Sequence, residues 1–157
     1  FAERARACGA DVSLAFALPE RLPLPEADFC MAMANLLENA VEACERAVRE
    51  EAGADGRGST AQDGARPLFV DAEARIEGNA VLVSVRNSCT PSDARALAAA
   101  APDGVLSSDV RSAKREGDGI GLASVATLAK RYRGEVQVEI DEYAATIHVL
   151  LFAGDAR

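Results

Sequence analysis

The sequence predicts an α+β fold: a two-layer sandwich in which a mixed, mostly antiparallel sheet of about five strands carries three main helices on one face. Three observations predict it. Several short segments alternate apolar and polar side chains with a period of two, as half-buried strands do. Longer segments repeat their apolar residues with the helical period instead. The chain of 157 residues has the length of one domain, so we expect residues 1–157 to form a single unit.

Five segments have the pattern of strands. Residues 12–18 alternate apolar with small side chains before prolines end the pattern. Residues 68–76 and 81–85 alternate on both sides of a Gly-Asn turn, which is typical of a hairpin. Residues 136–140 and 145–151 alternate again and close the chain. Together with the helices between them, these strands give the sheet of the predicted sandwich.

Three segments have the pattern of helices. The longest runs over residues 26–51, and the last runs over 120–133, where Gly134 is expected to form a left-handed C-terminal cap. A short alanine-rich helix is expected at 94–101. In the longest helix the apolar residues form one stripe with Leu37 at its centre. The stripe consists of Cys30, Met33, Ala34, Leu37, Ala40, Val41, Cys44 and Val48.

The composition excludes several classes of function. A net charge of −8 argues against nucleic acid as a partner, because phosphate backbones are bound by clusters of Lys and Arg. No apolar run approaches the roughly twenty residues of a membrane span, so we expect no direct membrane contact. The cysteines show no CxxC spacing and no histidine cluster, which favours reduced thiols over a zinc site. They are Cys8, Cys30, Cys44 and Cys89.

The polar side of the longest helix contains two asparagines one turn apart, Asn35 and Asn39. At 100° per residue they lie opposite Leu37, away from the apolar stripe. Asparagine is a poor residue for an exposed helix interior, and its side-chain oxygen suits Mg²⁺ beside phosphates. Both a solvated polar face and a ligand-binding face account for this pattern. The polar side comprises Asn35, Asn39, Glu42 and Arg46.

A glycine-rich string, Gly117-Asp118-Gly119-Ile120-Gly121-Leu122, opens the last helix. Such a run is either a flexible linker or a place where the backbone approaches phosphates at the positive end of a helix. Three cations, Arg111, Lys114 and Arg115, precede the string and favour the phosphate-binding interpretation.

Two irregular connections are expected to be mobile. Residues 52–66 are small, polar and rich in glycine. Residues 90–118 are broken by prolines and are long for a connection in a compact domain. We expect the second of these to be a lid that becomes more ordered when a ligand binds.

Asn87 ends the second strand of the predicted hairpin. An asparagine there can simply close a strand into a turn. Alternatively, its amide oxygen can accept a hydrogen bond from the exocyclic amine of a base.

These motifs, in this order, resemble those of the GHKL ATPase superfamily over nearly the whole chain. NLLENAVEA at 35–43 is similar to the N box, VRNSC at 85–89 stands at the adenine-contacting box, and DGIGL at 118–122 is similar to the second glycine box. The closest resemblance is to the ATP-binding domain of the peptide-pheromone-receptor (Agr-like) sensor histidine kinases. It implies a catalytic domain that uses ATP and Mg²⁺, with 90–118 as the ATP lid.

The resemblance implies a role for each position. Asn39 is the implied Mg²⁺ ligand, Asn35 a second contact to the metal or phosphates, and Asn87 the contact to adenine. Water-activating members have a glutamate where Asn35 stands here, so the resemblance favours phosphoryl transfer over hydrolysis and assigns no catalytic residue. The implied nucleotide-binding residues are Asn35, Asn39, Asn87, Lys114, Arg115, Gly117, Gly119, Ile120, Gly121 and Leu122.

The implied function is that of a catalytic fragment of a protein-histidine kinase. Such a domain presents the γ-phosphate of Mg·ATP to a histidine on a separate dimerisation domain, and a response regulator acts downstream. His148, the only histidine, lies mid-strand where packing is expected, so the chain alone is not expected to autophosphorylate. The implied location is the cytoplasmic side of a membrane-anchored receptor kinase.

Two other functions stay open. A GHKL serine kinase of the anti-sigma-factor type has about this length. A degenerate GHKL interaction module without nucleotide binding is supported by the adenine box, where Asn87-Ser88-Cys89 replaces the usual Asp-x-Gly. A nucleotide-binding measurement with and without Mg²⁺ distinguishes the second alternative from the kinases.

Overall fold

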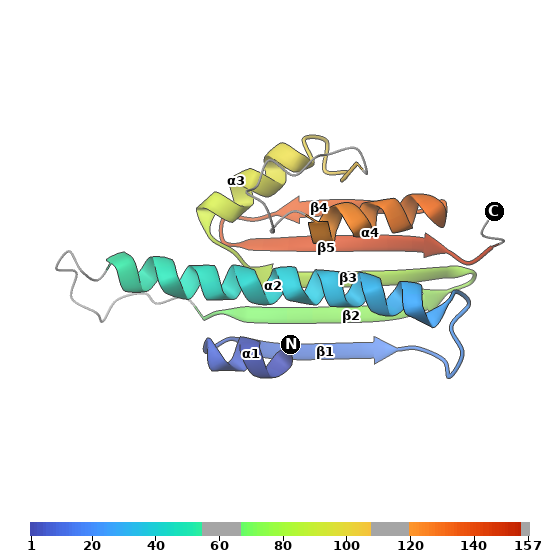
Figure 1. Ribbon diagram of the computed structural model, residues 1–157, viewed down its shortest axis with the longest axis horizontal. Helices are drawn as coiled ribbons and strands as arrows, with labels where there is room; N and C mark the ends of the chain where they lie inside the picture. Colours follow the sequence, from blue (N-terminus) through green and yellow to red (C-terminus); the bar gives the residue numbers. More distant parts are fainter. Residues whose placement is uncertain (55–66, 108–119, 155–157) are drawn as a thin grey trace.

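The computed structural model describes residues 1–54, 67–107 and 120–154, which form four helices and five strands (Figure 1). The helices are α1 (Ala2–Ala7), α2 (Glu26–Ala54), α3 (Pro91–Ala100) and α4 (Ile120–Arg131). The strands are β1 (Asp11–Ala17), β2 (Phe69–Glu77), β3 (Ala80–Ser88), β4 (Glu135–Ile140) and β5 (Ala144–Phe152). Residues 52–54 belong to α2, whereas the rest of the expected loop 52–66 and the expected lid from residue 108 onwards lie outside the described residues.

The strands form one mixed sheet in the order β1-β2-β3-β5-β4. β1 pairs with β2 in parallel, and every other neighbouring pair is antiparallel. Helix α2 makes the crossover that the parallel pair requires. In Figure 1, α1, α2 and α4 lie in front of the sheet, and α3 lies beyond its β4 edge. The predicted two-layer α+β sandwich with a mostly antiparallel sheet is confirmed.

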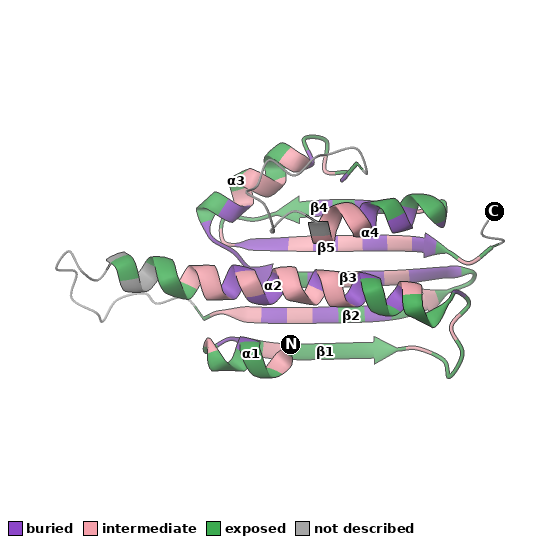
Figure 2. Cartoon of the chain, in the orientation of Figure 1, coloured by how far each residue is buried: buried purple, intermediate pink, exposed green. Residues whose placement is uncertain are grey.

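Alternation along the central strands separates a buried side of the sheet from an open side (Figure 2). On the helix-facing side, Val83 of β3 pairs with Val149 of β5, and each is 2% exposed. On the other side, Ser84 pairs with His148, whose Nε2 lies 3.8 Å from a carboxylate oxygen of Glu139. His148 therefore lies on the open face of the sheet and outside the core.

The apolar stripe of α2 is centred on Leu36, and the prediction of Leu37 was wrong. Leu36 is 1% exposed, Leu37 is only partly buried, and Cys30 and Val48 are exposed. Leucines at both positions are compatible with an apolar stripe, so packing against the sheet and the flanking helices decides which one points inward. The shift of one residue turns Asn35, Asn39, Glu42 and Arg46 from the solvent side to a flank of the helix.

The end of α4 also differs from the expected cap. The residue in the left-handed region is Arg133, with φ of 54°, and Gly134 follows it. The amide of Gly134 donates to the carbonyl oxygen of Ala129 at 2.8 Å, which closes the helix end. Gly134 is required for a different reason: a Cβ atom there would lie 1.6 Å from the carbonyl oxygen of Leu150.

All four cysteines are free. Cys44 and Cys89 are buried, and burial raises the pKa of each thiol to about 11. Both are therefore protonated at neutral pH and poor nucleophiles. No described helix is long and apolar enough to cross a membrane.

Candidate functional site

Asn35 and Asn39 lie on the flank of α2 that faces the first turn of α4. A Cβ atom added to Gly121, in that turn, would lie 3.1 Å from Nδ2 of Asn39 and 3.6 Å from Cβ of Asn35. Such a short contact requires the neighbour to move, so the close approach of the two helices favours glycine at this position. The structure thus brings the asparagine motif together with Gly121, the glycine of the string that lies within the described residues.

The amide nitrogen of Asn39 is buried without a hydrogen-bond partner, and it is the one side-chain nitrogen or oxygen in this state among the described residues. A buried polar group left unpaired costs about 1–3 kcal/mol, so native proteins keep few of them. An anion that accepts a hydrogen bond would satisfy this N–H group. The oxygen of the same amide is a hard, neutral ligand of the kind that binds Mg²⁺. Asn39 therefore has the features of a ligand-binding side chain.

Asn87 is 5% exposed and lies at the end of β3, on the helix-facing side of the sheet. Its Nδ2 donates to the carbonyl oxygen of Ser88 at 2.9 Å, and Oδ1 is the acceptor atom of the same amide. Small side chains pack beside this strand end, and one of them belongs to the turn of α2 that follows Asn39. These residues are Ala43, Cys89 and Ala145. Asn87 therefore presents an acceptor in apolar surroundings.

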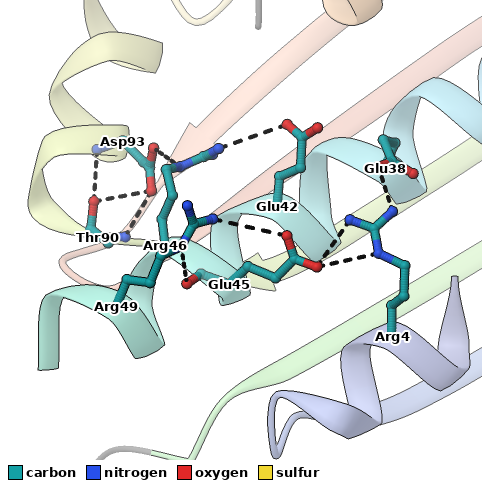
Figure 3. Close-up of polar contacts among 8 residues, drawn as sticks. All are labelled: Arg4, Glu38, Glu42, Glu45, Arg46, Arg49, Thr90 and Asp93. Carbon is teal, nitrogen blue, oxygen red and sulfur yellow. Dashed lines mark hydrogen bonds and ion pairs between the residues drawn. The ribbon is translucent and has the colours of Figure 1, made fainter. Parts of the chain in front are cut away.

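Helix α3 begins next to the same flank of α2 and is tied to it by an ion pair (Figure 3). Thr90 accepts from the amide of Asp93 at 3.1 Å, and the Asp93 carboxylate bonds back to Thr90, so the two form a capping box. Nε of Arg46 donates to the same carboxylate at 2.9 Å, and Nη1 of Arg46 lies 3.7 Å from Glu42. Thr90 and Asp93 were missed in the sequence, where the Thr-x-x-Asp spacing is the signal of a capping box. Because of this cap the helix begins at Pro91, three residues earlier than expected.

The structure describes only part of the predicted set of binding residues. It brings Asn35 and Asn39 into contact range of Gly121, and Ile120 begins α4 as expected. Leu122 is partly buried and packs on the hydrophobic core. The remaining predicted residues lie outside the described residues, and Arg111 and Asp118 lie there as well. They are Lys114, Arg115, Gly117 and Gly119.

A family profile described as the GHKL domain matches residues 60–152, more than half of the chain. The chain belongs to the GHKL family. The matched range includes Asn87 and Gly121, whereas Asn35 and Asn39 precede it. No protein of curated function matches the sequence.

Solved structures of histidine kinases share the fold of this GHKL domain. The catalytic domain of the histidine kinase ThkA aligns with a TM-score of 0.61 and 16% identity, covering 98% of this chain and 85% of that one. Full-length ShkA in complex with AMPPNP aligns with a TM-score of 0.56 and 22% identity over 99% of this chain, which spans 28% of ShkA. AdeS of Acinetobacter baumannii aligns with a TM-score of 0.60 and 10% identity, covering 99% of this chain and 60% of AdeS. These alignments extend over nearly the whole chain, and at such low identity they establish the fold.

Within this GHKL domain, the glutamates nearest to Asn39 in sequence are engaged by arginines. Glu38 accepts from Nη1 of Arg4 at 2.6 Å on the opposite flank of α2 (Figure 3). Glu42 pairs with Arg46 at 3.7 Å. The side of α2 next to α4 therefore presents asparagine amides, and its glutamate is held by a cation.

Proposed function

We propose that this chain is the nucleotide-binding catalytic domain of a sensor histidine kinase. The observation that carries the proposal is the unpaired, buried amide of Asn39 beside Gly121. It lies on the flank of α2 that approaches the N-terminal turn of α4, where a helix attracts anions. A polyphosphate at this place would supply the missing hydrogen-bond acceptor.

The proposed ligand is Mg·ATP. Asn39 would hold Mg²⁺ through its amide oxygen, Asn35 would contact the metal or the phosphates, and Asn87 would accept from the adenine amine. When bound, Mg²⁺ would supply neutralisation of the phosphate charge. Lys114 and Arg115, together with the glycine string, would complete the phosphate site, and segment 90–118 would be its lid.

We propose that the reaction is phosphoryl transfer to another protein. Hydrolysis needs a group that activates water, and Asn35 stands one turn before Asn39 where a glutamate would serve that role. Transfer depends mainly on positioning and charge stabilisation.

The acceptor is proposed to be a histidine of a dimerisation domain in the full-length kinase, which passes the phosphoryl group to a response regulator. His148 lies on the face of the sheet opposite the helices, whereas Asn39 lies in the helix layer. This separation supports an acceptor from outside the domain. Within the GHKL family we place the chain with the Agr-like kinases, as a cytoplasmic domain of a membrane-anchored receptor.

The test is a calorimetric titration of the chain with Mg·ATP and Mg·ADP, combined with a radiolabel transfer assay. We expect binding with micromolar-to-millimolar affinity and no stable label on the chain. Stable label on His148, or no binding at millimolar nucleotide, would overturn the proposal. The second of these results would favour the degenerate interaction module, whose supporting observation is Asn87 at the position of the usual adenine-contacting aspartate.

A further inference from the structure

The ion pair between Arg46 and Asp93 joins the flank of α2 that bears Asn39 to the start of α3. The Asp93 side chain is 7% exposed and the Arg46 side chain 27% exposed. Because the Asp93 carboxylate is largely removed from water, loss of Arg46 leaves that charge poorly solvated. Arg49, three residues further along α2, is 70% exposed, and its Nη2 lies 3.9 Å from Glu45. Arg46 and Arg49 therefore have the same side chain, but Arg46 pairs with Asp93 of α3, whereas Arg49 pairs with Glu45 of its own helix.

The two oxygens of the Asp93 carboxylate hold different groups. Oδ2 accepts from the amide and the hydroxyl of Thr90 at 3.3 and 3.0 Å, which caps α3. Oδ1 accepts from Nε of Arg46 at 2.9 Å. A single side chain thus shapes the first turn of α3 and fixes that turn to α2. Just beyond α3, the amide of Val138 donates to the carbonyl oxygen of Gly104 at 2.7 Å, which holds the chain to β4.

Helix α3 covers the small apolar cluster beside Asn87. Its residues Ala94 and Leu97 pack on this cluster, which comes from α2, β5 and the chain just after β3. The cluster consists of Ala43, Cys89 and Ala145. Since Ala43 is one turn beyond Asn39, movement of α3 would open the apolar side of the candidate site to water.

We propose that Arg46 is a positioning residue for nucleotide binding. By holding Asp93 it keeps α3 on the apolar cluster and closes the site beside Asn87, without itself contacting the nucleotide. The inference rests on the proposed function, because it concerns the same site. It predicts that Arg46 and Asp93 act as one unit and that Arg49 does not take part.

The experiment compares nucleotide affinity and hydrogen exchange among matched variants of the whole chain. Arg46→Met removes the cation, and Asp93→Asn removes the charge while keeping an oxygen that can accept from Thr90. Each should weaken Mg·ADP binding by about three- to tenfold, with the double variant no weaker than either single one. Amide exchange across 91–101 should rise by about tenfold in both single variants. Arg46→Lys should recover part of the affinity, and Arg49→Met should leave both measurements unchanged.

Three results would overturn the proposal. Additive losses in the double variant would mean that the two residues act separately. Faster exchange in α3 with unchanged Mg·ADP affinity would mean that the ion pair holds the helix but does not influence the site. Absence of Mg·ADP binding by the unsubstituted chain would reject the proposed function together with this inference, whereas the first two results leave the proposed function intact.

Discussion

Both flanks of α2 carry polar side chains, but these side chains are paired differently on the two sides. On the flank facing α1, Glu38 and Glu45 both bind the guanidinium of Arg4, at 2.6 and 2.9 Å (Figure 3). On the flank facing α4, Asn39 keeps a buried amide N–H without a partner. The charged residues of the first flank pair within the chain, whereas on the second flank the amide nitrogen of Asn39 has no partner among the described residues.

The flank with the unpaired amide is the one where a ligand is expected to bind. The exposed ion pairs of Arg4 are more conspicuous in the sequence, but pairs of this kind are satisfied within the chain and contribute little to stability. A neutral amide left unpaired inside the protein is far less common. Substitutions at Asn39 and Gly121, each compared with a matched change elsewhere, test this contrast most directly.

Asn39→Ala should have the largest effect on nucleotide binding. In Mg²⁺ we expect the affinity for ADP to fall by about tenfold or more, equivalent to ~1.4 kcal/mol, because the proposed metal ligand is lost. In EDTA the loss should be much smaller. The free energy of unfolding should change by less than about 1 kcal/mol, since the substitution also removes an unpaired polar group. Calorimetry and urea unfolding give the two quantities.

The matched control for this substitution is Glu38→Gln, one residue earlier on the other flank. It should leave nucleotide affinity unchanged in both conditions. If Asn39→Ala instead lowered the free energy of unfolding strongly and left the Mg²⁺ dependence of nucleotide affinity intact, Asn39 would be a structural residue. The unpaired amide on this flank would then not indicate a ligand site.

Gly121→Ala should lower nucleotide affinity without lowering the stability of α4. The added Cβ would lie 3.1 Å from Nδ2 of Asn39, so the amide must shift and nucleotide binding should weaken by about threefold, a loss of ~0.6 kcal/mol. Alanine is favoured over glycine inside helices by up to ~1 kcal/mol, so α4 itself should not be weakened.

Gly53→Ala is the control for helix propensity, because a Cβ atom at Gly53 of α2 meets no atom within 4 Å. It should raise the melting temperature slightly and leave nucleotide affinity unchanged. Equal losses of affinity in the two alanine variants would show that the effect of Gly121 does not come from contact with Asn39.

Local patterns predicted the five strands and the helices α2, α3 and α4, because each face of such an element meets a different environment, whereas the short helix α1 was not predicted. The alternation of Val81, Val83 and Val85 follows from one side facing helices and the other facing solvent. The rotation of α2 was not predictable in this way. Leu36 and Leu37 are equally apolar, and only contacts with distant elements decide which one is buried.

In the candidate site, too, features that lie within a short stretch of sequence were predictable, and contacts between distant residues were not. Asn39 and Gly121 were predicted because their motifs are local strings, and the structure adds that the two lie so close across a helix interface that a Cβ atom at Gly121 would crowd the Asn39 amide. The ion pair of Arg46 with Asp93 joins residues 47 positions apart, so no local spacing reports it. Only its capping half, Thr90 with Asp93, leaves a signal in the sequence.

A pH titration tests the core that lies between the two flanks. Burial raises the pKa of Cys44 and Cys89 from 9.0 to about 11, so the folded state retains protons that the unfolded chain releases. The stability from these neutral thiols is fully present below pH 9 and is lost as the pH rises towards 11. Urea unfolding between pH 7 and pH 11 should show this decline, and Cys44→Ala should reduce its slope. An equally steep decline of stability in a variant lacking both thiols would mean that other groups cause it. The first candidate is Tyr132, whose pKa is raised to about 12 by burial and by its hydrogen bond to Asp28.

The smallest effect is expected for Arg4→Met, which removes both interactions of the satisfied flank at once. The Arg4 side chain is 47% exposed, and exposed ion pairs are weakened by solvent and by salt. We therefore expect a small decrease in melting temperature at low ionic strength, none at high ionic strength, and no change in nucleotide affinity. Thermal unfolding at two salt concentrations, with a Mg·ADP titration of the same variant, measures all three. A clear loss of nucleotide affinity would mean that a change on the flank facing α1 affects the site on the flank facing α4. The two flanks of α2 would then not be independent.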